Sequence, residues 1–271
     1  MRIKNEINEL DFTYKPIHTT ETRYQPQTRL PNMTPKRLNP IAGAALRFVF
    51  YILCLGTMVL LVTWEAKRHT GDILFNENSI LESLQATLLF LTAASAYLAG
   101  HLNDSDSPLA SLLVGVASIA AIREFDFALD RYVFDGAWQA MALIVAAFTF
   151  IHAWHHRTAL KEAVLSFIGR PSFGVMAAGG ITVLVFSRLL GRQVLWQAVM
   201  HEGYMRSVKN AVEESCELLG YSLIFFGTLE FLYEAILARK NARHTAPNKA
   251  PQAPKKDKAS PYLRKNSGLH F

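Results

Sequence analysis

The sequence has little cysteine and little charge. Its 271 residues contain only two cysteines, Cys54 and Cys216, and this number excludes a disulfide framework. Charged residues make up 18% of the chain, hydrophobic residues make up 51%, and the mean hydropathy is +0.14. A soluble domain of this size is ordinarily more polar. The composition therefore indicates a membrane protein.

Basic residues are scarce in the middle of the chain. Residues 41–238 carry 12 Lys and Arg but 17 Asp and Glu, whereas residues 1–40 carry seven basic and four acidic residues. Residues 239–271 carry nine basic residues and one acidic residue. The sequence pI near 9.3 thus comes from the two ends. A net-acidic, apolar middle excludes a basic nucleic-acid-binding domain, and we expect no nucleic-acid partner.

What the chain does contain is long apolar runs. Six of them approach the ~20 residues with which a helix crosses ~30 Å of hydrocarbon. They are continuous and rich in Leu, Ala and Ile, without the two-residue alternation of a barrel strand. The sequence therefore predicts an all-α integral membrane protein, a bundle of about six transmembrane helices. The expected spans are residues 41–64, 80–100, 109–122, 137–154, 173–190 and 215–237.

The segments outside these spans differ in character. Residues 1–40 are polar and show no 3.6-residue apolar period, so we expect a disordered N-terminal arm before the bundle at 41–238. Residues 239–271 predict a basic, disordered C-terminal tail. Residues 160–168 and 190–200 have apolar residues at helical spacing beside charged residues, which is typical of interfacial amphipathic helices. A helix that packs a loop against the bundle is the alternative for both.

The basic ends also bear on orientation and partners. Six spans place both ends on one side of the membrane, and the positive-inside rule favours the cytoplasm for the side with the two basic arms. The short loops favour a bacterial inner membrane. A basic tail after the last span attracts anionic lipid headgroups, at about 1 kcal/mol per basic residue near the surface. Membrane lipids are therefore the expected partners, and a homo- or hetero-oligomer stays open.

Ionisable residues from four separate stretches converge on the outer membrane face once the spans are threaded in this way. Glu213 and Glu217 are four residues apart and share a helix face. Glu82 and Glu217 lie about one turn inside their apolar runs, where an unpaired carboxylate is costly and normally faces the bundle interior. The candidate residues of this outer polar cluster are Glu82, Arg123, Glu124, Asp126, Arg188, Arg192, Glu213 and Glu217, with Glu77, Asp130 and Glu214 beside them.

Four roles for the outer polar cluster stay open. Carboxylates suit a hard divalent cation such as Ca²⁺ or Mg²⁺. Arginines bind phosphate or carboxylate groups through paired hydrogen bonds. Closely spaced acids can carry protons or act as general acid and base. The fourth role is structural, as a ring of salt bridges that holds helix ends together.

Histidines gather at the opposite face. His152 and His156 are four residues apart at the end of the fourth span, and His101 ends the second span on the same side, so a transition-metal site is geometrically possible. Residues 152–156 resemble the HxxHH box of membrane fatty-acid desaturases and hydroxylases, enzymes that hold two irons with several such boxes, whereas this chain has one. The alternative is that the histidines lie at headgroup level as interfacial residues.

Two further residues form a candidate pair within the membrane. Arg47 lies in the cytoplasmic half of the first span and Glu230 in the corresponding half of the last. At similar depth they can form an intramembrane ion pair. Such a pair is more typical of helix locking than of transport.

These observations support function hypotheses of three classes. The leading one is a non-enzymatic membrane protein whose outer polar cluster binds an ion or an anionic ligand, as a transporter or an accessory subunit. A membrane-embedded, metal-dependent enzyme acting on lipid is one alternative, and a structural or assembly factor without a ligand is the other. The sequence has no Gly-rich nucleotide loop, Ser-His-Asp order or Cys-rich metal motif. It leaves the cofactor unknown, and a divalent cation is compatible with it.

Overall fold

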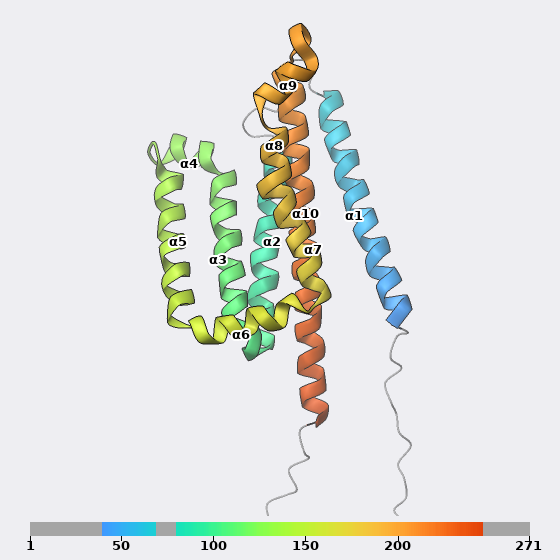
Figure 1. The fold of residues 1–271 in the computed structure, drawn as a ribbon, viewed down its shortest axis with the longest axis vertical. Coiled ribbons are helices and arrows are strands. Elements are labelled where there is room, and N and C mark those ends of the chain that lie inside the picture. Colours follow the sequence, from blue (N-terminus) through green and yellow to red (C-terminus); the bar gives the residue numbers. More distant parts are fainter. Residues whose placement is uncertain (1–39, 69–79, 246–271) are drawn as a thin grey trace, which may run out of the picture. The chain divides into compact units, whose positions relative to one another are not determined.

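The computed structural model describes residues 40–68 and 80–245. All regular elements in these two ranges are helices (Figure 1), which confirms the prediction of an all-α, multi-pass membrane protein. Six helical segments are long and apolar enough to cross a membrane: Ile41–Trp64, Ile80–Leu102, Asp104–Glu124, Ala137–His155, Pro171–Leu190 and Arg206–Arg243.

The chain divides into two units between Leu46 and Arg47. Of the first unit the structure describes residues 40–46, which begin helix α1 (Pro40–Arg68). The remainder of α1 and all the other described helices belong to the second unit. The predicted arm at 1–40, apart from Pro40, and residues 246–271 of the predicted tail lie outside the described residues.

The second unit continues with both long and short helices. Its elements after α1 are α2 (Ile80–Leu102), the 3₁₀-helix η1 (Asp104–Asp106), α3 (Ser107–Glu124), α4 (Asp126–Tyr132), α5 (Ala137–His155), α6 (Arg157–Ile168), α7 (Pro171–Ile181), the π-helix η2 (Thr182–Ser187), α8 (Arg188–Leu190), α9 (Gln193–Met200), the 3₁₀-helix η3 (His201–Gly203) and α10 (Arg206–Thr245).

The ends of several helices differ from the expected spans. Prolines at 108 and 171 lie in the first turns of α3 and α7, where the missing N–H has no partner to lose. The fifth span is not one regular helix, because η2 separates α7 from α8. Helix α10 begins before residue 215 and continues past residue 238, so residues 239–245 of the predicted tail are helical. Hydropathy marks only the apolar part of a helix, whereas polar helix formers extend it on both sides.

Glycines allow α7 to approach α10 closely. A Cβ atom on Gly179 would lie 2.7 Å from the backbone oxygen of Gly220 and 2.7 Å from the backbone nitrogen of Ile224. A Cβ atom on Gly227 would lie 2.8 Å from the backbone nitrogen of Met176. Small residues allow backbones in a membrane to pack at such distances. This contact sets the position of η2 and α8 against α10.

Two apolar clusters form the core of the second unit. One joins α2, α3, α6, α7 and α10 and includes Leu109, Phe167 and Phe231. The other joins α2, α3, η2 and α10 and includes Leu89 and Val183. Because Phe167 is buried, α6 packs against the bundle, as the alternative for residues 160–168 expects. Helix α9, which covers most of the second predicted amphipathic segment, has no buried residue.

Two of the long helices present almost all of their side chains to the outside. None of the apolar window of α1 and 6% of that of α5 is buried within the protein. Lipid tails are as apolar as leucine, so outward-facing apolar side chains carry no penalty in a membrane. In the second unit α1 contacts α10 through Tyr51, whose ring stacks on that of Phe226 with centroids 4.4 Å apart.

Candidate functional site

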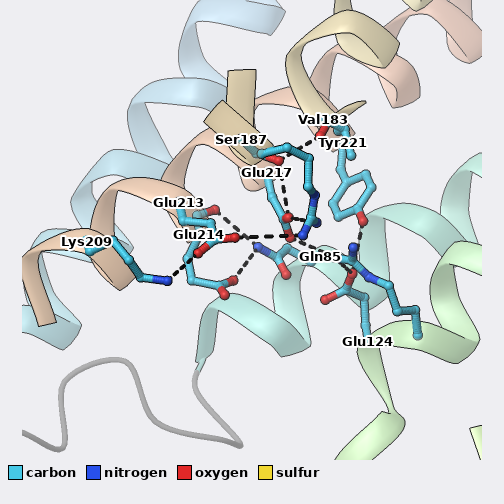
Figure 2. A network of polar contacts seen from close by, with 11 residues as sticks. Gln85, Glu124, Val183, Ser187, Lys209, Glu213, Glu214, Glu217 and Tyr221 are labelled. Carbon is cyan, nitrogen blue, oxygen red and sulfur yellow. Dashed lines mark hydrogen bonds and ion pairs between the residues drawn. The ribbon is translucent and has the colours of Figure 1, made fainter. Parts of the chain in front are cut away.

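A buried carboxylate on α10 is the centre of the largest polar network. Only 3% of the Glu217 side chain is exposed. Its Oε2 accepts a hydrogen bond from Arg123 Nη2 on α3 at 2.8 Å, and its Oε1 accepts one from Arg188 Nη2 on α8. The Ser187 hydroxyl lies 3.2 Å from the same Oε1 (Figure 2). One carboxylate thus joins three elements that are far apart in the sequence.

Further charges extend this network in both directions. On one side Arg123 also donates to Glu124 Oε1 at 3.0 Å, which accepts a second hydrogen bond from the Tyr221 hydroxyl at 2.9 Å. On the other side Arg188 lies 3.7 Å from Glu213, which accepts a hydrogen bond from Lys209 at 2.8 Å. Positive and negative groups therefore alternate along the network.

One acid in the network has an amide as its partner instead of a cation. Glu214 Oε2 accepts a hydrogen bond from Gln85 Nε2 of α2 at 3.1 Å, and Glu214 makes no ion pair with any residue that the structure describes. Gln85 is fully buried, and its Oε1 has no hydrogen-bond partner. We call the whole set the Glu217 network: Gln85, Arg123, Glu124, Ser187, Arg188, Lys209, Glu213, Glu214, Glu217 and Tyr221.

The structure brings together five of the eight residues predicted for the outer polar cluster: Arg123, Glu124, Arg188, Glu213 and Glu217. Half-buried Glu82 lies on α2, one turn before Gln85, and has contacts of its own. Asp126 and Arg192 are exposed and form no ion pair with other described residues. Asp126 begins a separate helix after the turn at Phe125, and Arg192 follows the end of α8, so neither side chain continues a bundle helix.

One residue beside the predicted cluster has another place. Asp130 accepts a hydrogen bond from the backbone N–H of Gly136 at 3.1 Å, which closes the turn between α4 and α5. Gly136 has a φ of +87°, a conformation that glycine adopts without strain. Glu77 lies outside the described residues.

Three neutral members of the network were not expected from the sequence. Gln85 and Ser187 lie in apolar runs, where a single polar residue has no distinctive pattern. Tyr221 follows Glu217 by four residues and therefore shares its helix face, the one signal that could have indicated it.

An apolar cavity of about 410 Å³ adjoins the network. Its walls come from α2, α3, α5, α7, η2 and α10, and its lining includes the network residues Arg123 and Tyr221. The other lining residues are almost all apolar, and they extend along α3 as far as Leu113. The cavity thus combines a long apolar interior with a guanidinium and a phenol hydroxyl.

A second polar network lies at the opposite ends of the helices. Asp106, 1% exposed, accepts two hydrogen bonds of 2.8 Å from the guanidinium of Arg170 and one of 2.8 Å from Asn103. These hydrogen bonds to Asp106 raise the pKa of Arg170 above its usual value. Glu234 of α10 lies 3.9 Å from Arg170 and accepts a hydrogen bond from Ser172. We call these five residues the Asp106 network; the sequence pattern did not indicate it.

The structure also brings Arg47 and Glu230 together. Arg47 Nε lies 2.9 Å from Glu230 Oε1, and the Tyr51 hydroxyl donates to the same oxygen at 2.6 Å. The guanidinium of Arg47 lies 5.0 Å from the ring centroid of Tyr233. These contacts join α1 to α10 within the second unit.

The histidines do not form the predicted three-residue metal site. The rings of His152 and His156 are 4.7 Å apart, but His101 packs its ring against Tyr97 of its own helix. Helix α3 packs against both α2 and α5 and lies between them (Figure 1). Among the described residues no three His, Cys, Asp or Glu side chains are grouped so that they could hold a metal ion.

Comparison with protein-family models, with curated proteins and with solved structures gives no match. Inference about function therefore depends on the Glu217 network, the cavity beside it and their chemistry.

Proposed function

We propose that this protein is a membrane-embedded binding protein for an anionic amphiphile, which places its headgroup on Arg123 and its chain in the cavity. The observation that carries the proposal is the double position of Arg123, whose guanidinium belongs to the Glu217 network and also lines the cavity. The protein would then act as a transporter of such an amphiphile or as an accessory subunit that binds it.

The hydrogen-bonding capacity of Arg123 supports an anionic headgroup. A guanidinium carries five N–H donors. Arg123 uses Nη2 for Glu124 and Glu217, and its Nη1 and Nε have no hydrogen-bond partner among the described residues. The side chain is 36% exposed, and its two ion pairs hold it in place. A guanidinium fixed in this way can present paired N–H groups to a phosphate, carboxylate or sulfonate without a further loss of freedom.

The dimensions of the cavity support an apolar chain. Leu113 and Arg123 both line it and are ten residues apart on α3, a distance of about 15 Å along a helix. Its volume of about 410 Å³ lies within the ~300–1,000 Å³ of ligand pockets. An elongated apolar space with a cation at one end matches a single-chain anionic amphiphile in shape and in charge.

A structural factor without a ligand is the second candidate. What favours it is the pairing of Glu217, whose two oxygens are both bound by arginines from different helices. Buried ionic groups of this kind can hold elements in register. The binding protein is expected to bind an anionic amphiphile in the cavity, whereas the structural factor is expected to bind none.

Binding of dodecyl sulfonate tests the headgroup contact. In full-length protein reconstituted in lipid nanodiscs, we expect saturable binding of dodecyl sulfonate but not of methanesulfonate, and weaker binding of dodecanol. Arg123→Gln will weaken the binding about 10–100-fold, because charge-assisted hydrogen bonds of about 1.5–3 kcal/mol are lost. Arg188→Gln is the matched control, because Arg188 also pairs with Glu217 but does not line the cavity. Equal losses in the two variants would contradict the proposal.

A glycine pair on α7 tests the chain contact within the same experiment. A Cβ atom on Gly180 or on Gly174 meets nothing within 4 Å, but only Gly180 lines the cavity. Gly180→Leu should therefore abolish saturable binding of dodecyl sulfonate, whereas Gly174→Leu should leave it unchanged. Full affinity in a folded Gly180→Leu protein would exclude the cavity as the site of the chain.

We also propose a location in a bacterial inner membrane, with both termini in the cytoplasm. The six apolar helices and the basic residues at both ends of the chain support it. The basic residues after α10 suit anionic lipid headgroups on that side.

Thiol labelling tests this orientation. In a variant without Cys54 and Cys216, a cysteine at Glu202, exposed in η3, should react with a membrane-impermeant reagent in intact cells. A cysteine at Ala250 should react only after the membrane is opened. The reverse pattern would invert the orientation, and labelling of both sites in intact cells would contradict a membrane-crossing α10.

A further inference from the structure

We propose that Glu214 and Gln85 form a proton-binding site, and that the proton taken up there promotes binding of the anionic headgroup at Arg123. The first half of this inference is independent of the proposed function, whereas the second half rests on it.

The first observation is the unpaired oxygen of Gln85. The side chain is fully buried between α2 and α10, and its Nε2 donates to both the carboxylate and the backbone oxygen of Glu214. Its Oε1 has no hydrogen-bond partner within residues 40–68 and 80–245. Buried polar atoms without a hydrogen bond are rare in folded proteins. In Figure 2 the Gln85 amide lies among the acids of the network. The Oε1 atom of Gln85 is therefore an acceptor for which an added proton on a neighbouring acid would supply the donor.

The second observation is the position of Glu214 between two acids that have cations. On the same helix, Glu213 pairs with Lys209 and Arg188, and Glu217 pairs with Arg123 and Arg188. Among the residues that the structure describes, Glu214 has only the Gln85 amide as a side-chain partner. A carboxylate in an apolar helix without a cation is costly when it is ionised, and protonation removes that cost.

Charge balance gives the number of protons. The groups that surround Glu214 come from every element packed here: Glu82 from α2, Arg123 and Glu124 from α3, Arg188 from α8, and Lys209, Glu213, Glu217 and Tyr221 from α10. Within the Glu217 network four carboxylates face three cations, and Glu82 adds a carboxylate that has contacts of its own. One proton on Glu214 makes the network itself neutral.

Gln85 can serve both charge states of Glu214. An amide presents either its NH₂ group or its carbonyl oxygen when it turns over. The NH₂ group donates to the carboxylate and to the backbone oxygen of Glu214. When the amide turns over, its carbonyl oxygen accepts the O–H of the carboxylic acid, and the hydrogen bond to the backbone oxygen is given up. A proton needs only these two groups, whereas the described residues hold no group of three acids, histidines or cysteines for a metal cation. The ligand at this site is therefore a proton from solvent.

The link to the headgroup follows from charge. Without the proton the network has an excess of negative charge near Arg123, which opposes an incoming anion. Protonation of Glu214 removes that excess, so an anionic headgroup binds more tightly. By thermodynamic linkage the bound anion favours the proton to the same degree.

Infrared difference spectroscopy tests the proton site without any amphiphile. On acidification of the full-length protein in nanodiscs we expect the band of one buried carboxylic acid, present in wild type and in Glu213→Gln but absent in Glu214→Gln. Gln85→Leu replaces the buried amide by an apolar side chain. This variant should keep the band at a shifted frequency, because the Glu214 acid loses the amide oxygen that accepts its hydrogen bond. Persistence of the band in Glu214→Gln, or an unshifted band in Gln85→Leu, would overturn the proton site.

Dodecyl sulfonate, which stays ionised at every working pH, tests the coupling. We expect its affinity for the wild type to rise about fivefold or more as Glu214 becomes protonated. The Glu214→Gln variant should bind it at every pH with the high affinity of the protonated wild type. The coupling would be overturned if the affinity of Glu214→Gln still rose on acidification. It would also be overturned if addition of Mg²⁺ or Na⁺ at constant pH raised the affinity of the wild type in the same way. Absence of dodecyl sulfonate binding at every pH would contradict the proposed function while the infrared result still decides the proton site.

Discussion

Glu217→Gln will lower the free energy of unfolding by about 3 kcal/mol. Glu217 is 3% exposed and accepts hydrogen bonds from two guanidinium groups, each worth about 1.5–3 kcal/mol. Glutamine can accept one of these bonds but brings no charge, so Glu124 and Glu213 are the charged partners that the two arginines keep. Thermal and denaturant unfolding of the purified protein, followed by circular dichroism, measure the loss.

Glu213→Gln is the matched control for this prediction. Glu213 is also a glutamate of α10 with two cationic neighbours, but it is more exposed and lies 3.7 Å from Arg188. Its removal should cost less than about 1 kcal/mol. Combining Glu217→Gln with Arg188→Gln should recover part of the loss, because the cation that has lost its closest carboxylate is removed. Equal stabilities of the Glu217→Gln and Glu213→Gln proteins would show that the pairing does not hold the helices together.

The membrane spans were predictable because length and hydropathy suffice to define them. The break in the fifth span was not, since the residues of η2 are ordinary apolar residues. The polar start and end of α10 were missed for a related reason: a hydropathy pattern marks where a helix is apolar, not where its hydrogen bonds end. The burial of α6 depends on Phe167, whose contact with α10 no local pattern reveals.

Except for Lys209, which precedes the last apolar run, the charged part of the Glu217 network was accessible from the sequence, because ions in apolar runs must find partners. Arg123, Arg188 and Glu217 follow from that rule once the helices are threaded. Gln85 and Ser187 do not, since a neutral polar residue in a membrane helix can bond to its own backbone, as Ser187 does with Val183. The cavity was equally hidden, because its shape depends on how six helical elements pack.

Arg170→Gln will lower the free energy of unfolding by about 3–5 kcal/mol, the largest loss that we expect. The substitution leaves Asp106, 1% exposed, without the cation that binds both of its oxygens. The raised pKa of Arg170 keeps the guanidinium charged at every pH at which the protein is handled, so the loss should not depend on titration of the arginine. Unfolding of the purified variant in detergent measures it.

The exposed Arg157 of α6 supplies the control for Arg170. Within the described part of the chain, Arg157 bonds only to the backbone oxygen of Trp154, at 3.5 Å, and lies over its ring. Arg157→Gln should therefore cost less than about 1 kcal/mol. The double variant Asp106→Asn with Arg170→Gln should be more stable than Arg170→Gln alone, because no buried charge is left unpaired. The contrary outcome is additivity: the double variant loses as much stability as Asp106→Asn and Arg170→Gln lose in sum. Asp106 and Arg170 would then contribute independently, and their ion pair would not be the contact that joins η1 to the start of α7.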